Sequence, residues 1–155
     1  MKHLLTRLQA DHPAIHFQAA ERFFWSPQEQ TVYYDPKKAS NEAQWALLHE
    51  LSHALLGHKT YKTDFELLQL EVAAWDQAEK LSNTYHIKID AEHVQDCLDT
   101  YRDWLHARSK CPSCGTHGVQ ANPSTYQCLN CRTEWNVTTE RFCRPYRKKV
   151  NRDTN

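Results

Sequence analysis

The sequence has no apolar run close to the roughly 20 residues that a membrane-spanning helix needs. Its first residues, MKHLLTRLQADHP, also lack the apolar core of a secretory signal peptide, because Thr6, Arg7 and Gln9 interrupt the leucines. Glycine is scarce, with 3 residues in 155, and no low-complexity tract is present. We therefore expect a cytoplasmic protein with no membrane partner.

The formal net charge is zero, because 19 basic residues balance 19 acidic ones, but the two signs are unevenly distributed along the chain. Residues 1–109 carry 11 Lys and Arg against 16 Asp and Glu, whereas residues 110–155 carry 8 against 3. A charge split of this kind is typical of two parts with different partners. We predict one domain over residues 1–109 and a smaller one over residues 110–155.

The first domain combines strand and helix patterns, which predicts an α+β fold. A short helix over about residues 1–10 precedes three aromatic and β-branched segments at 14–17, 22–25 and 31–34, and these predict a small antiparallel sheet. Three longer helices are then expected to begin after the N-cap residues Ser40, Thr63 and Asp90. The first should end at Gly57, and the others near residues 81 and 107.

The helix after Ser40 contains His49-Glu50-Leu51-Ser52-His53, an HExxH motif. Residues four apart share one helical face, so His49 and His53 can direct imidazole nitrogens at one ion. Zinc with three protein ligands keeps an open position for water and lowers the pKa of that water to about 7. Glu50 is the expected catalytic residue, because it can remove the proton before attack on a peptide carbonyl. The alternative is a chance motif.

The third zinc ligand is expected on the next helix, at Glu71. The positions three and four residues from Glu71 are apolar: Leu67, Leu68, Ala74 and Trp75. A carboxylate on such a buried face is costly unless it has a partner, and metal coordination supplies one. His58 and Asp64 are alternative ligands, and a salt bridge from Glu71 to Arg22 or Arg102 is the alternative without metal.

HELSHALLGH at residues 49–58 is similar to the HELxHxxL helix of the ImmA/IrrE family of metallopeptidases. EVAAW at 71–75 resembles the glutamate-containing helix that follows it, although Val72 stands where the family usually has Ala. The resemblance covers about residues 25–81. It implies a small zincin-like, gluzincin-type domain in which Glu71 completes the catalytic zinc site. It also implies a metalloendopeptidase whose protein substrate is a regulator, since family members cleave repressors.

The second domain contains two CxxC pairs, Cys111 with Cys114 and Cys128 with Cys131. Two such pairs 13 residues apart can supply four thiolates to one tetrahedral zinc ion. Gly115 follows the first pair and suits a tight knuckle turn. The sequence therefore predicts a four-cysteine zinc ribbon with a structural, closed zinc site, with Tyr126 and Trp135 packed around it.

The remaining features favour no single role. Cys97 of the first domain and Cys143 of the second are left over, and a core or inert cysteine is expected at both positions. A basic tail predicts contact with nucleic acid or, alternatively, a solvated or docked segment. Its members are Arg141, Arg144, Arg147, Lys148, Lys149 and Arg152.

The sequence thus predicts a zinc-dependent metalloendopeptidase with one catalytic and one structural zinc ion. One alternative is a SprT-like protease that acts on DNA-bound proteins, which would need a third histidine ligand, and His58 is the nearby candidate. Another is a non-proteolytic zinc-binding adaptor for nucleic acid or a regulator. The intact Glu50 favours the enzyme.

Overall fold

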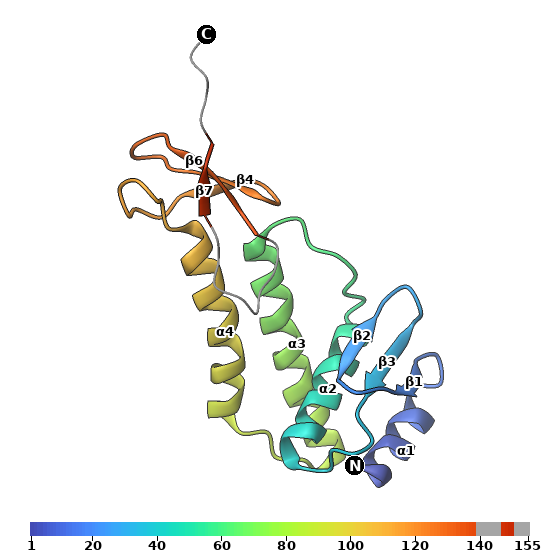
Figure 1. Ribbon diagram of the computed structural model, residues 1–155. Helices are drawn as coiled ribbons and strands as arrows, with labels where there is room; N and C mark the ends of the chain where they lie inside the picture. The colour runs from blue at the N-terminus through green and yellow to red at the C-terminus, as the bar shows by residue number, and fades with distance from the viewer. Residues whose placement is uncertain (139–146, 151–155) are drawn as a thin grey trace. The chain divides into compact units, whose positions relative to one another are not determined.

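The computed structural model describes residues 1–138 and 147–150, which form an α+β structure with four helices and two small sheets (Figure 1). The chain forms two compact units. The N-terminal unit comprises Met1–Thr60 and Gln69–Gln95, and the C-terminal unit comprises Tyr61–Leu68 and Asp96–Asn155. No helix in the described part of the chain is long and apolar enough to cross a membrane.

The helices and strands follow one another along the chain with short connections. In the N-terminal unit they are α1 (Lys2–Asp11), β1 (His16–Ala19), β2 (Phe24–Ser26), β3 (Thr31–Tyr34) and α2 (Asn41–Leu55). The residues of α3 (Asp64–Tyr85) and α4 (Ala91–Ser109) are divided between the two units. The C-terminal unit adds β4 (Val119–Asn122), β5 (Thr125–Gln127), β6 (Glu134–Val137) and β7 (Arg147–Lys149). The predicted division at residues 109 and 110 stays a prediction.

The first sheet has the order β1-β3-β2 and is mixed, so the predicted purely antiparallel sheet is wrong. β2 pairs with β3 antiparallel, and β1 pairs with β3 parallel. The reason is geometric: the chain reverses between β1 and β2 and again between β2 and β3. Two reversals give β3 the direction of β1, and β1 pairs with the edge of β3 that the β2–β3 hairpin leaves free.

Helix α2 lies against this sheet, as Figure 1 shows, and contacts β2 and β3. Its start is the predicted one: the Ser40 hydroxyl accepts a hydrogen bond from the Ala43 amide at 3.3 Å. Its buried face continues into the core of the N-terminal unit, where Leu47, Leu48, Leu51 and Val32 are fully buried. HExxH therefore lies on a helix whose orientation is fixed by apolar packing.

Helix α3 begins at the predicted capping residue, since the Thr63 hydroxyl accepts from the Glu66 amide at 3.1 Å. The helix runs to Tyr85, four residues beyond the expected end. It ends in a Schellman turn, in which His86 has a positive φ of 57° and the Ile87 amide donates to the Ser82 carbonyl at 2.8 Å. Histidine is not typical of the left-handed position in this turn, so the sequence gave no signal that the helix ends here.

The second sheet has the order β4-β5-β6-β7 and is antiparallel throughout. Its core is small and consists of Cys111, Tyr126, Cys128, Trp135 and Val137. The predicted packing of Tyr126 and Trp135 around the cysteines is confirmed. Gly118 is required here, because a Cβ at that position would lie 2.5 Å from both the Gln127 carbonyl oxygen and the Trp135 ring.

Candidate metal centres

Two groups of side chains in the described residues have the composition and spacing to hold a metal ion. The first is the predicted set His49, His53 and Glu71. His49 Nε2 lies 3.1 Å from His53 Nε2 and 3.2 Å from Glu71 Oε2, and His53 Nε2 lies 3.7 Å from Glu71 Oε1. The three side chains are 10%, 12% and 8% exposed. Two imidazoles from α2 and one carboxylate from α3 thus converge.

The separations of these atoms fit a zinc ion. With metal–ligand distances of about 2.05 Å and tetrahedral angles, two ligand atoms lie about 3.3 Å apart. The three separations of 3.1, 3.2 and 3.7 Å bracket that value. Two neutral imidazoles and one carboxylate are also a donor set that zinc accepts. The residues therefore fit zinc in both chemistry and spacing, although the geometry does not identify the metal.

Among the described residues, the ion pairs of Glu71 are with these two histidines, and it forms none with Arg22 or Arg102. Arg102 pairs with Asp99 at 2.7 Å, and Arg22 lies over the Phe24 ring. Burial alone would raise the pKa of Glu71, but hydrogen bonds and charge from His49 and His53 hold that pKa well below its usual range. Glu71 is therefore an ionised carboxylate, as a ligand must be.

Glu50 lies beside this group and is not part of it. Its Oε2 accepts a hydrogen bond from the Trp25 backbone amide at 2.9 Å, so an edge strand of the sheet holds the carboxylate in place. Burial raises the pKa of Glu50, while the charges of His49 and His53 oppose the rise. A carboxylate with a raised pKa is suited to accept a proton near neutral pH. Sequence reasoning missed Trp25, which lies 25 residues earlier in the chain.

The two histidines of the motif have different surroundings. His49 stacks on Trp75 with ring centroids 4.3 Å apart, and its buried Nδ1 has no hydrogen-bond partner among the described residues. His53 has a partner for its Nδ1, because His58 Nδ1 lies 2.9 Å away. His58 was predicted as an alternative ligand, but it is not in the converging group and contacts the opposite edge of the His53 ring.

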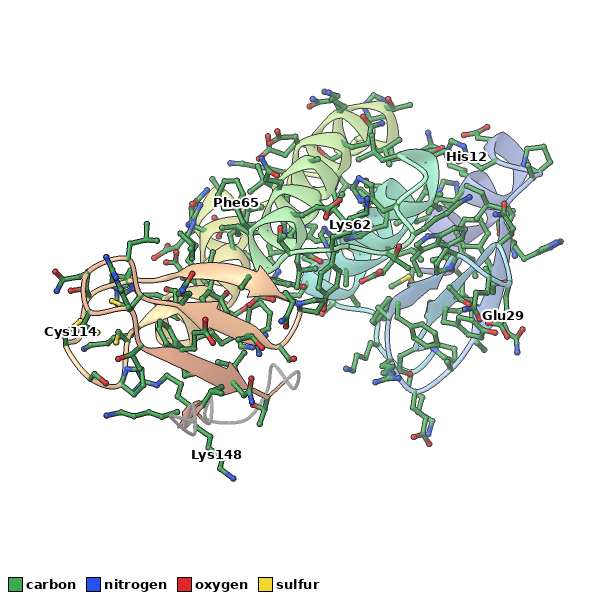
Figure 2. All side chains as sticks on the ribbon, turned by 90° about the horizontal axis from the view of Figure 1, so that it is seen from above. His12, Glu29, Lys62, Phe65, Cys114 and Lys148 are labelled. Atoms are coloured by element: carbon green, nitrogen blue, oxygen red, sulfur yellow. The ribbon has the colours of Figure 1, made fainter. Side chains whose placement is uncertain are left out.

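The second group is the predicted set Cys111, Cys114, Cys128 and Cys131. All four are free, and Figure 2 shows Cys114 at the end of the second sheet with further sulfur atoms beside it. The Sγ atoms of Cys111 and Cys131 are 3.6 Å apart, and those of Cys114 and Cys128 are 3.5 Å apart. Tetrahedral zinc with bonds of about 2.3 Å places its sulfurs about 3.8 Å apart, so these thiols also fit zinc.

Two similar turns present the four thiols. The Gly115 amide donates to the Cys111 carbonyl at 3.0 Å, and the Arg132 amide donates to the Cys128 carbonyl at 2.9 Å. Both residues have positive φ, 75° at Gly115 and 60° at Arg132, which confirms the turn expected at Gly115. Hydrogen bonds from the Thr116 side chain and backbone lower the pKa of Cys114 to about 5. This shift favours the thiolate that a metal requires.

Asp64, the other alternative ligand, lies in a buried hydrogen-bonded cluster of the C-terminal unit. Its Oδ2 accepts from Arg108 Nε at 2.6 Å and from the Tyr126 hydroxyl at 2.6 Å. Arg108 is 1% exposed, and burial together with the Asp64 hydrogen bond raises the pKa of Tyr126. The sequence did not predict this cluster, because partners 44 and 62 residues away carry no local signal.

Within residues 1–138 and 147–150, the other predicted residues add no further metal group. Cys97 is half-buried in α4, and Cys143 lies outside the described residues. Of the basic tail, only Arg147, Lys148 and Lys149 are described, as strand β7, and the two lysines are exposed. No protein-family model, curated protein or solved structure matches the chain. The functional proposal therefore depends on these residues and their geometry.

Proposed function

We propose that the protein is a zinc-dependent metalloendopeptidase of the kind that the ImmA/IrrE resemblance implies. In this proposal His49, His53 and Glu71 hold the catalytic zinc, and Glu50 is the catalytic residue. The four cysteines hold a second, structural zinc, and the substrate is a regulatory protein. The observation that carries the proposal is the convergence of three ligand atoms, all within 4.8 Å of one another, next to a carboxylate that is not a ligand.

A zinc ion bound by this group would polarise a peptide carbonyl and make a water molecule acidic enough to lose a proton near pH 7. Glu50 would accept that proton on its carboxylate as the water oxygen bonds to the carbonyl carbon, and it would return the proton to the amine nitrogen as the peptide C–N bond breaks. The Trp25 amide keeps one Glu50 oxygen in place throughout. Glu71 stays ionised and occupies the third ligand position, so Glu50 is free for proton transfer.

The donor set favours this proposal over a SprT-like protease. That alternative needs a third histidine ligand, whereas the third converging atom belongs to Glu71. Glu71 also satisfies the expectation from the ImmA/IrrE resemblance, in which a glutamate on the following helix completes the site. The adaptor alternative shares the metal site but assigns no proton transfer to Glu50, so a Glu50 variant separates it from the enzyme.

The proposal is tested with Glu50→Gln, which keeps the size of the side chain and removes its ability to accept a proton. The probe is a proteome-derived peptide library, with cleaved peptides identified by mass spectrometry and bound zinc counted by elemental analysis. We expect the wild type to cleave peptides with two zinc ions bound, and Glu50→Gln to bind two and cleave none. Glu42→Gln on the exposed start of the same helix is the matched control and should cleave normally.

Two results would contradict the proposal. Cleavage by Glu50→Gln at the wild-type rate would remove the catalytic role of that residue. A wild type that binds both zinc ions and cleaves no peptide would favour the adaptor. The metal assignment has its own check, because His53→Ala should lower the zinc content from two ions to one.

A further inference from the structure

We propose that His58 is a positioning residue that fixes the tautomer and ring orientation of His53. In this arrangement His58 Nδ1 accepts a hydrogen bond from Nδ1–H of His53, which leaves the lone pair of His53 Nε2 directed at the metal position. The inference deepens the proposed function and rests on it, since it concerns one ligand of the same zinc site. His58 does not touch substrate or metal in this proposal.

The two Nδ1 atoms are within hydrogen-bonding distance, and they lie on the ring edges that the proposal requires. His53 Nδ1 and His58 Nδ1 are 2.9 Å apart, and the rings meet edge to face with centroids 5.0 Å apart. The other nitrogen of the same ring, His53 Nε2, lies 3.1 Å from His49 Nε2 and 3.7 Å from Glu71 Oε1. One edge of the imidazole thus faces His58 while the opposite edge faces the other two ligands.

The proton count decides which histidine is the donor. A neutral imidazole carries one proton, and a nitrogen that ligates a metal cannot carry it. Ligation through Nε2 therefore places the proton of His53 on Nδ1, where it can only donate. His58 must then present an unprotonated Nδ1 and keep its own proton on Nε2. Histidine ligands of metals usually donate their second N–H in this way, and the partner sets the tautomer.

The turn after α2 explains why His58 reaches this position. The Gly57 amide donates to the Ala54 carbonyl at 3.1 Å, and the His58 amide donates to the His53 carbonyl at 3.0 Å, which is a Schellman turn. Gly57 has a φ of 68°, as this turn requires. Such turns bring the second residue after the helix cap, here His58, against the side chain three positions inside the helix, here His53, usually as an apolar contact. In this chain a hydrogen-bonded histidine pair takes that place.

A hydrogen bond from Trp25 also holds the loop that contains His58. The Trp25 indole N–H donates to the His58 carbonyl at 2.9 Å, while the Trp25 amide donates to Glu50. The backbone of His58 is therefore held by α2 and by β2, and the residue is half-buried. His49 has no equivalent partner, since its Nδ1 is unpaired among the described residues and its ring is held by Trp75. The positioning role is thus specific to His53.

The experiment compares three variants of the full chain. His58→Phe keeps a ring at this position but removes the acceptor. His58→Asn keeps an acceptor oxygen close to the place of Nδ1. His3→Phe changes an exposed histidine of α1 in the same way and is the control. All three are first checked for a wild-type circular dichroism spectrum and for retention of the zinc ion held by the cysteines.

Two readouts follow, and neither is enzyme activity. Proton and nitrogen-15 NMR of the zinc-loaded chain reports whether the Nδ1–H of His53 is hydrogen-bonded, and competition with a chelator gives the affinity of the histidine site for Zn²⁺ alone. We expect a hydrogen-bonded Nδ1–H of His53 in the wild type, His58→Asn and His3→Phe, and loss of that hydrogen bond in His58→Phe. The zinc affinity of His58→Phe should fall by about 10–100-fold, the range that outer-partner substitutions cause, with substantial recovery in His58→Asn.

The possible outcomes distinguish a failure of this inference from a failure of the proposed function. A wild type with two zinc ions, together with an unchanged Nδ1–H hydrogen bond and an unchanged zinc affinity in His58→Phe, would overturn the positioning role alone. Equal losses in His58→Asn and His58→Phe would show that an acceptor at this position does not restore the site, which also overturns the positioning role. A wild type that binds only the zinc of the cysteines would remove the catalytic metal site, and the inference would fall with it.

Discussion

Glu71 of the first metal group and Glu50 beside it differ in environment, and the difference fits the roles proposed for them. Glu71 faces two imidazoles, which keep its pKa low and its side chain ionised. Glu50 is on the neighbouring helix, where burial raises its pKa and one backbone amide holds it. A pair of acidic residues whose pKa values are moved in opposite directions is typical of a site that needs one fixed anion and one proton acceptor.

Replacing Glu71 with Gln should disable the first metal group without unfolding the helix. The amide is uncharged and a much weaker zinc ligand, so we expect the affinity of this site for zinc to fall more than the roughly 10–100-fold caused by losing an outer partner. Titration with a chelator measures the change. Glu79→Gln, an exposed position on the same helix, should bind two zinc ions as tightly as the wild type, and equal affinities in both variants would exclude Glu71 as a ligand.

The ion pair between Asp64 and Arg108 makes a second residue-level prediction. Asp64→Asn leaves the Arg108 charge buried without a counterion, and such losses cost about 3–5 kcal/mol. Urea unfolding of the zinc-loaded chain, followed at the C-terminal sheet, measures the loss. Asp76→Asn removes an exposed carboxylate from the same helix and should change stability by less than about 0.5 kcal/mol. Similar effects in the two variants would show that the buried pair is not stabilising.

The sequence was sufficient for the residues whose partners follow from helical periodicity. His49 and His53 share a face because they are four apart, and Glu71 stood out because its helical neighbours are apolar. The contacts of Trp25, His58 and Asp64 were not predictable in the same way. Trp25 and Asp64 contact residues that lie far away in the chain. The contact of His58 depends on the left-handed backbone conformation of Gly57, which moves the next side chain off the helical face.

At the level of secondary structure, α2 and α3 end in the same Schellman turn with different residues at its left-handed position. Gly57 occupies it after α2, and His86 occupies it after α3 with a φ of 57°. Glycine adopts this conformation without strain, whereas a side chain costs about 1 kcal/mol or more. The predicted end of α2 therefore agreed with the structure. The end of α3 was predicted four residues too early, because nothing in the sequence marks His86 as the residue at which this helix stops.

His86→Gly should stabilise the N-terminal unit, since it removes the strain at an exposed position. We expect a gain of about 0.5–1 kcal/mol, reduced somewhat by the greater freedom of glycine in the unfolded chain. Thermal or urea unfolding measures it. His86→Ala is the matched control, because it removes the imidazole and keeps the strain, so it should give no gain. A gain of equal size in both variants would attribute the effect to the side chain.

For the whole molecule, the two units should depend on metal to different extents. The core of the second sheet is a cluster of five residues, two of which are cysteines of the four-thiol group. A core this small does not hold a sheet without its metal. The N-terminal unit has a larger apolar core that includes Leu8, Leu47, Leu48, Leu51 and Ala78, all fully buried, so its fold does not depend on the ion.

Removal of zinc by a strong chelator should therefore melt the second sheet and leave the first unit folded. Hydrogen exchange measures this, with loss of protection expected at the amides of Tyr126 and Val137 and retention at Leu48 and Ala78. Cys128→Ser should reproduce the loss without chelator, and His53→Ala should not. Protection that persists at Tyr126 and Val137 in the metal-free chain would show that this sheet is stable by itself.

The C-terminal unit is discontinuous in sequence, because Tyr61–Leu68 belongs to it and Gln69–Gln95 does not. A truncated gene product that begins at Lys110 would keep all four thiols and lose both Asp64 and Arg108. The Tyr126 hydroxyl would then be left in the interior without its acceptor. The shortest uninterrupted stretch that encodes the entire unit begins at Tyr61 and includes all of α3 and α4. Expression of the C-terminal unit by itself should accordingly start there.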